Sequence, residues 1–351
     1  MIFRKKIRRF CQHIETHPFI PDRNRGGDIE FVYVGKAIRS CNIQGFVFYG
    51  LAVGTVVQLL CYAFTSPVRI KTIFDPITNM TTIKQTRALP FNCKLPFDTA
   101  QSPYFEIVSV TGTILGGSYG FSIGSMDAII CGIMCHIRAQ LLILKECLRT
   151  FVERAVYLMK EDTKLSEFDS KMLETISKNV DDIVEIPSIL QKYVRIAICQ
   201  IIEHHQKVIN LAKDTDDVFS LLMLTQFLFS LGILCFMLFQ LSLTPVRSFH
   251  FFGMTCYLFL MLFQLYLYCY RGNEIIIHSH NITDEIFGSS WFLADVSTQK
   301  LLLTMMTRAC RPIRMTAGKF VYLSLEAFMS IVRGSGSYFM VLKNTNAPRT
   351  D

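Results

Sequence analysis

Four long stretches without Asp, Glu, Lys or Arg constrain this chain more than any other feature. They contain 29, 20, 29 and 23 residues and are Ser40–Val68, Ile107–Met126, Val218–Val246 and Ser248–Tyr270. A helix needs about 20 apolar residues to cross the hydrocarbon core of a bilayer, so each stretch is a candidate span. Charged residues make up only 18% of the chain, against about 25% in typical soluble domains. The sequence therefore predicts an all-α polytopic membrane protein.

A fifth candidate span, Met315–Leu342, has 28 residues but contains charges. Lys319, Glu326 and Arg333 recur every seven residues, which keeps them on one side of a helix. Steps of three and four residues extend the same line through Ser330, Ser337, Val341 and Asn344. Ionisable side chains are costly when they face lipid, so this pattern predicts a helix with one side in contact with water inside a bundle. An amphipathic helix on a soluble domain or at a membrane interface is the alternative.

The distribution of basic residues predicts the orientation of these five spans. With residue 1 in the cytoplasm, segments 1–45, 136–217 and 271–314 lie inside and contain 26 of the 36 Lys and Arg residues. The segments that would then lie outside contain eight. This excess on the inner side favours a cytoplasmic N-terminus and an extracellular C-terminus. Because the net charge of +8 follows this topology, it does not indicate a surface that binds nucleic acid.

The predicted topology divides the chain into seven regions. They are a cytoplasmic N-terminal segment 1–45, spans one and two within 46–135 with an outer loop 66–103, a cytoplasmic helical region 136–217, spans three and four within 218–270, a cytoplasmic helical region 271–314, the last span 315–342 and an extracellular tail 343–351. We expect short helical pieces in 1–45. The five prolines of the outer loop oppose helix and strand formation and predict an ordered, irregular lid.

Two of the predicted helices extend beyond the bilayer. Apolar residues keep helical spacing from span two through Met159, which predicts one helix of about 55 residues, or about 80 Å. A second long helix is expected from just after Pro187 to just before Pro245, with a shorter segment, Ser166–Ile186, between the two. These extensions predict a cytoplasmic helical stalk whose apolar faces need partners, and hence an assembly region.

Span two also carries a row of small residues. Gly112, Gly116, Gly120 and Gly124 follow one another at intervals of four. In a membrane such a row lets the backbone of a second helix approach closely. A loosely wound or kinked helix is the alternative interpretation.

No catalytic or cofactor-binding pattern is present in the sequence. The adjacent residues His204 and His205 do not share a helix face, and His278 and His280 are two residues apart, a poor spacing on a helix. Metalloprotease, nucleotide-binding and serine hydrolase motifs are missing. We therefore predict neither an enzyme nor a cofactor, and the cysteine spacing predicts no disulfide framework.

Several motifs do resemble one family. Gln299-Lys-Leu-Leu-Leu, Thr316-Ala-Gly-Lys-Phe, Leu323-Ser-Leu-Glu-Ala-Phe and Ser337-Tyr-Phe-Met-Val-Leu closely resemble the C-terminal signature of insect odorant receptors. Leu95-Pro-Phe-Asp with Ser102-Pro-Tyr is similar to an outer loop of that family, and Gly272-Asn-Glu-Ile with Ser279 and Trp291 is similar to its last inner loop. Together these motifs cover about residues 90 to 345.

This resemblance implies a seven-span protein of the plasma membrane and a tetrameric cation channel formed with a co-receptor subunit. It also implies that a small volatile organic ligand binds in the outer half of the helix bundle and that the last helix lines the pore. Carried over by position, the pore constriction falls on Val341, with Asn344 one turn outward. Ser337 and Arg333 would face the same conduit.

The chain departs from the family pattern in three places. Five spans are visible where the family has seven, and the motifs make the first two the absent ones, as expected for a fragment, an incomplete gene model or a shortened isoform. Gly336 stands where a tyrosine is usual. Ser109 and Gly112 stand where a tyrosine and a glutamine are usual.

We therefore expect the ligand-binding subunit of an odorant-gated, non-selective cation channel. From depth and spacing, we predict a ligand site formed by Val57 and Cys61 on span one with Val108 and Thr111 on span two. Ordinary core packing is the alternative for these four side chains. A gustatory-type chemoreceptor channel and a non-conducting truncated receptor are the alternative functions.

Overall fold

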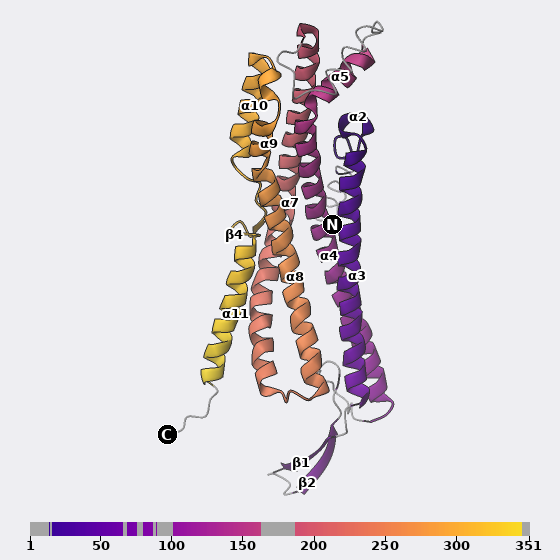
Figure 1. Cartoon of the computed structure of the whole chain (residues 1–351). Helices are drawn as coiled ribbons and strands as arrows, with labels where there is room; N and C mark the ends of the chain where they lie inside the picture. The colour runs from indigo at the N-terminus through magenta and orange to yellow at the C-terminus, as the bar shows by residue number, and fades with distance from the viewer. Residues whose placement is uncertain are drawn as a thin grey trace. The chain divides into compact units, whose positions relative to one another are not determined.

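The computed structural model describes residues 14, 16–65, 69–75, 80–86, 89, 101–162 and 187–345. The helices and strands are α2 (Arg23–Gly26), α3 (Asp28–Thr65), β1 (Arg69–Asp75), β2 (Met80–Thr86), α4 (Tyr104–Arg149), α5 (Phe151–Asp162), α7 (Ser188–Leu243), α8 (Phe249–His280), α9 (Ile282–Gly288), the 3-10 helix η2 (Trp291–Leu293), α10 (Val296–Ala309), β3 (Thr316–Ala317), β4 (Val321–Tyr322) and α11 (Leu325–Thr345), as Figure 1 shows.

The chain forms two compact units, and α3, α4, α7, α8 and α11 each run from one into the other. Unit 1 consists of Met1–Cys41, Ile130–Phe227 and Leu267–Phe328, and unit 2 consists of Asn42–Ile129, Leu228–Tyr266 and Met329–Asp351.

The predicted spans are helical. Within the described residues, Asp28–Thr65, Tyr104–Arg149, Ser188–Leu243 and His250–Gly288 are long and apolar enough to cross a membrane. The 56 residues of α7 extend over about 84 Å, well beyond a bilayer core of about 30 Å. The prediction of a long helix between Pro187 and Pro245 is therefore confirmed. The last helix, with 21 residues, is not among these four.

The first long helix begins earlier than predicted. Instead of several short pieces in 1–45, only α2 precedes α3 in the part of the chain that the structure describes, and α3 continues from Asp28 without a break into span one. Gly27 has φ +67, the left-handed conformation that commonly ends a helix. Asp28 and Glu30 then lie in the first turn of α3, where negative charge favours the helix dipole.

The outer loop is not wholly irregular. β1 and β2 form an antiparallel hairpin in which Arg69 pairs with Thr86 and Asp75 with Met80. Pro67, Pro76 and Pro90 flank the strands rather than interrupt them, so the proline count misled the prediction for these residues. The Leu95-Pro-Phe-Asp motif and the predicted segment Ser166–Ile186 lie outside the described residues.

The helix predicted to run from span two through Met159 is interrupted at Thr150. The Thr150 amide and hydroxyl both donate to the carbonyl oxygen of Glu146, at 3.0 Å each. A threonine that bonds back to the preceding turn commonly bends a helix. The apolar pattern predicted through Met159 does continue beyond the bend, since α5 buries Phe151, Ala155 and Met159.

The last helix begins at Leu325, ten residues later than Met315, the predicted start. The preceding residues form the short hairpin β3–β4, with Gly318 at φ +62 and Lys319 at φ +66 in its turn. Lys319 therefore does not share a helix with Glu326 and Arg333. The seven-residue recurrence was a real pattern in the sequence, but its first member belongs to a different element.

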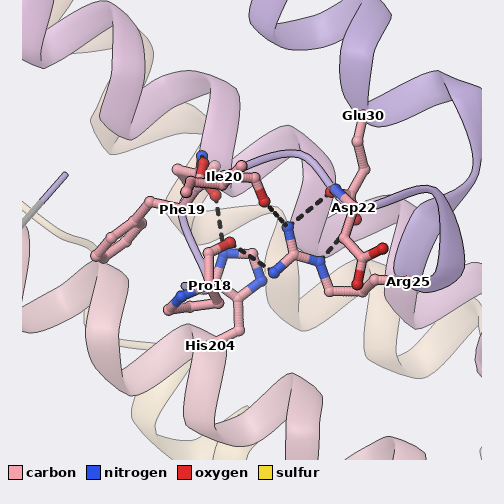
Figure 2. Close-up of polar contacts among 8 residues, drawn as sticks. Pro18, Phe19, Ile20, Asp22, Arg25, Glu30 and His204 are labelled. Carbon is pink, nitrogen blue, oxygen red and sulfur yellow. Dashed lines mark hydrogen bonds and ion pairs between the residues drawn. The ribbon is translucent and has the colours of Figure 1, made fainter. Parts of the chain in front are cut away.

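In unit 1, polar side chains join the N-terminal segment to the helices. Arg25 forms two bonds of 2.7 Å with the Glu30 carboxylate and donates to the Pro18 carbonyl oxygen at 2.5 Å (Figure 2). The Gln140 side chain donates to the Phe19 carbonyl oxygen and contacts His204 Nε2, both at 2.9 Å. Gln140 of α4 thus links the N-terminal segment to α7.

In unit 2, α3 and α4 pack through the glycine row at one of the predicted positions. A Cβ atom at Gly124 would lie 2.8 Å from the Phe48 ring, whereas one at Gly120 would meet nothing within 4 Å. The Tyr49 and Ser125 hydroxyls are 2.9 Å apart beside this contact. The helix is continuous through all the glycines.

Candidate functional site

The hairpin that precedes α11 is fixed to α7 by a carboxylate, within unit 1. The Asp216 carboxylate accepts from the Thr316 amide at 2.6 Å and from the Thr316 hydroxyl at 2.8 Å. Lys319 Nζ forms ion pairs with both Asp216 and Asp217, the latter at 2.7 Å. Burial alone would lower the pKa of Lys319, but the bonds to the two carboxylates more than offset it, and the pKa is raised.

The local sequence suits this attachment. The Gly318 amide donates to the Ser220 carbonyl oxygen at 2.7 Å, and a Cβ atom at Gly318 would lie 2.5 Å from Leu224. Glycine therefore meets two needs here, a left-handed backbone and a close approach to α7. A Cβ atom at Gly272 would likewise collide with the Leu323 carbonyl oxygen. The residues just before α11 are thus held by both α7 and α8.

The predicted pore-lining residues lie on an uncovered side of α11. Arg333, Ser337, Val341 and Asn344 are all exposed, as are Glu326 and Ser330 on the same line. Val341 is 59% exposed, while Ala327 and Ser335 on the other side are buried. The structure therefore places all six residues on one helix face that the described part of the chain does not cover. This face, Glu326 to Asn344, is called the exposed line below.

Sequence reasoning missed an apolar cavity of about 420 Å³ in unit 2, between α7 and the C-terminal part of α11. Its lining residues are Leu228, Leu231, Gly232, Cys235, Phe236, Tyr338, Val341 and Leu342. Gly232 contributes no side chain to the lining. A glycine within the long apolar stretch of α7 was the signal in the sequence that could have indicated this cavity. Val341 belongs both to this cavity and to the exposed line.

The four residues predicted to bind ligand are not gathered into this cavity. Val57 is 51% exposed, Cys61 and Thr111 are exposed, and Val108 is half-buried. They remain predictions.

Two of the buried polar residues of α4 in unit 2 lie beside Val108 and Thr111 in the sequence. Ser109 and Thr113 are both buried, and the Thr113 hydroxyl donates to the Ser109 carbonyl oxygen at 2.7 Å. The Ser109 hydroxyl has no hydrogen-bond partner within the described part of the chain. Hydroxyl side chains four residues apart in an apolar stretch were the signal that could have identified this face, because polar groups in a membrane turn inward.

Comparisons with known proteins agree with one another. A family model described as 7tm Odorant receptor matches residues 40–336. Odorant receptor 22c of Drosophila melanogaster is 28% identical over 73% of this chain and 57% of that receptor. Odorant receptor Or1 of Anopheles gambiae is 24% identical over 74% of this chain and 60% of that receptor. The chain thus spans less than two thirds of the length of these curated relatives.

The fold is also similar to solved structures. The insect olfactory receptor OR5 from Machilis hrabei, in complex with eugenol, aligns with a TM-score of 0.70 at 16% identity, over 97% of this chain and 75% of that one. A second structure of the same receptor aligns with a TM-score of 0.72 at 16% identity, over 98% of this chain and 76% of that one. The arrangement of long helices is therefore shared.

Proposed function

Because this chain belongs to the insect odorant receptor family, we propose that it is the ligand-binding subunit of an odorant-gated, non-selective cation channel that works with a co-receptor subunit. The family consists of multi-pass membrane receptors, not enzymes. In this proposal the N-terminus is cytoplasmic, the C-terminus is extracellular, and α11 lines the pore of a hetero-tetramer in the plasma membrane.

The exposed line of α11 is the observation on which the channel proposal rests. It includes the charged residues Glu326 and Arg333 and the polar residues Ser337 and Asn344, none of which is covered by the described part of the chain. Lipid is a poor environment for such a face. A water-filled conduit between subunits would solvate it. Val341 would then form the apolar constriction, and the Asp216 attachment would fix the inner end of each pore helix.

We propose that a small volatile organic molecule binds among α3, α4 and α8 in unit 2. The Machilis receptor was solved with such a molecule, eugenol. Val57, Cys61, Val108 and Thr111 remain the proposed contacts. We add Ser109, whose buried and unpartnered hydroxyl could bond to a polar group of the ligand.

Two serines of α11 allow a matched test of the pore. Ser337 is exposed, whereas Ser335 is buried two residues away. Each is changed to cysteine in a background without the native Cys61 and Cys235, expressed with the co-receptor, and exposed to a membrane-impermeant thiol reagent. We expect odorant-evoked current to fall in Ser337→Cys and to persist in Ser335→Cys.

Other outcomes would overturn the proposal. If the parent chain gives no odorant-evoked current despite proven delivery to the cell surface, it is not a channel subunit. Current without the co-receptor would favour the gustatory-type alternative. Co-purification with the co-receptor, without any change in co-receptor currents, would favour a non-conducting receptor.

A further inference from the structure

Two cysteines meet across the contact between α3 and α4 in unit 1. Cys41 packs against a buried cluster that contains Cys135, and neither thiol is in a disulfide. Sequence spacing could not reveal this pair, because its members are 94 positions apart in the chain. The two helices thus present one thiol each to a shared contact.

Small residues bring the two helices close at this point. Ala37 lies one turn before Cys41 on α3, and Ala139 lies one turn after Cys135 on α4. Ala37, Cys135 and Ala139 form a buried cluster against which Cys41 packs. Paired small residues four positions apart permit close backbone approach. A disulfide requires such an approach, since its Cα atoms lie about 4.4–6.8 Å apart.

A buried cation lies beside the pair. The Arg271 guanidinium of α8 donates to the Ser40 hydroxyl at 2.6 Å and to the Glu274 carboxylate at 2.7 Å. Its positive charge favours the thiolate form of Cys41, which follows Ser40 in the chain. A nearby cation stabilises the thiolate, which is the reactive form of cysteine.

The two thiols differ in access. Cys135 is only 2% exposed, whereas Cys41 is half-buried. A small oxidant would therefore reach Cys41 first, with Cys135 held behind it as the second thiol. This asymmetry is typical of redox-sensing cysteine pairs, in which an accessible thiol lies beside a resolving one.

We propose that Cys41 and Cys135 form a redox site at which a hydroperoxide drives a reversible disulfide between α3 and α4. The Cys41 thiolate attacks the peroxide, the O–O bond breaks, and the leaving oxygen takes a proton and departs as an alcohol, or as water from hydrogen peroxide. Cys41 becomes a sulfenic acid. The Cys135 sulfur then attacks Cys41, the S–S bond forms, and the S–O oxygen leaves as water with the Cys135 proton. In total, two thiols lose two electrons and the peroxide gains them.

The cross-link would restrict α3, which buries few of its own side chains. On this 38-residue helix, the buried residues among those whose burial is described are Glu30, Ala37 and Ala63. A covalent bond one turn from Ala37 would therefore add a strong constraint where few contacts exist. Oxidation would therefore hold α3 against α4 and lower the odorant-evoked current, and this effect on current rests on the proposed channel function.

The chemical test does not depend on conduction. Membranes that contain the full chain with its co-receptor are treated with hydrogen peroxide, remaining thiols are alkylated, and peptides are analysed by mass spectrometry. We expect a Cys41–Cys135 linked peptide that disappears with dithiothreitol and in Cys41→Ser. The exposed Cys199 of α7 is the control, and Cys199→Ser should retain the linked peptide.

The functional test follows the same samples. Odorant-evoked current should fall by roughly twofold or more after peroxide and recover with dithiothreitol. In Cys41→Ser, peroxide should leave the current unchanged. The absence of the linked peptide, or Cys41 found only as sulfinic or sulfonic acid, would overturn the redox site. If the linked peptide forms in a chain that never conducts, the redox site is supported and the proposed channel function is overturned.

Discussion

The two parts of α4 lie in different environments. In unit 1, nearly every side chain from Ile130 to Leu148 is buried or half-buried by other helices of the same chain. In unit 2, large apolar side chains such as Leu115 and Tyr119 are exposed. One continuous helix therefore has a part that its own chain covers and a part that needs lipid, ligand or another subunit. Mutations of equal size should have unequal effects in the two parts.

The largest expected contrast is between two leucines of α4. Leu144 is fully buried in unit 1, and Leu115 is 64% exposed in unit 2. Leu144→Ala should lower the free energy of unfolding by about 2–5 kcal/mol, because it leaves a cavity. Leu115→Ala should change it by about 0.5 kcal/mol or less. Thermal unfolding of the detergent-solubilised receptor measures both, and equal effects would mean that the two parts are equally well packed.

Next in size is a contrast between neighbouring carboxylates of α7. The Asp216 side chain is largely buried, and Asp217 is half-exposed. Asp216→Ala leaves the Thr316 amide and hydroxyl without their acceptor and should cost about 1–3 kcal/mol. Asp217→Ala removes an ion pair in contact with solvent and should cost about 0–1 kcal/mol. Unfolding temperatures and odorant-evoked current are the measurements, and a larger loss in Asp217→Ala would contradict the assigned roles.

Two glycines near α11 should respond in opposite directions. Gly318→Ala adds a Cβ atom against Leu224 at a left-handed position and should destabilise the receptor by about 1–2 kcal/mol. A Cβ atom at Gly336, within α11, would meet nothing within 4 Å. Gly336→Ala should therefore stabilise the helix by about 0.5–1 kcal/mol. The sign of each change in unfolding temperature decides the matter.

The smallest effect concerns pH and again involves unit 1. Burial lowers the pKa of His204 to about 3, from an ordinary value of 6.5. The folded state therefore disfavours the protonated ring, so stability is complete above about pH 6.5 and declines as the pH falls below it. Between pH 7.5 and 6 the expected loss is about 1 kcal/mol. Unfolding temperatures at the two pH values should differ less in His204→Gln, which does not titrate, than in the parent chain.

The sequence predicted the positions of the spans better than it predicted their surroundings. Proline marks a helix boundary in the local sequence, so α7 begins and ends close to the positions expected from Pro187 and Pro245. The start of α11 depends on contacts with Asp216 and Ser220, about 100 residues away, which no periodicity contains. On α4, length predicts depth in the membrane but not the rotation of the helix, so the buried face of Ser109 and Thr113 could not be predicted. The ligand contacts Val108 and Thr111 stay predictions.

The attachment of the β3–β4 hairpin to α7 has a mechanical consequence within unit 1. Asp216 and Ser220 lie about one turn apart on α7, and they accept from the Thr316 and Gly318 amides, respectively. Two bonds to successive turns of one helix oppose both sliding and rotation of the hairpin along it. The residues that lead into α11 would therefore follow any movement of this part of α7.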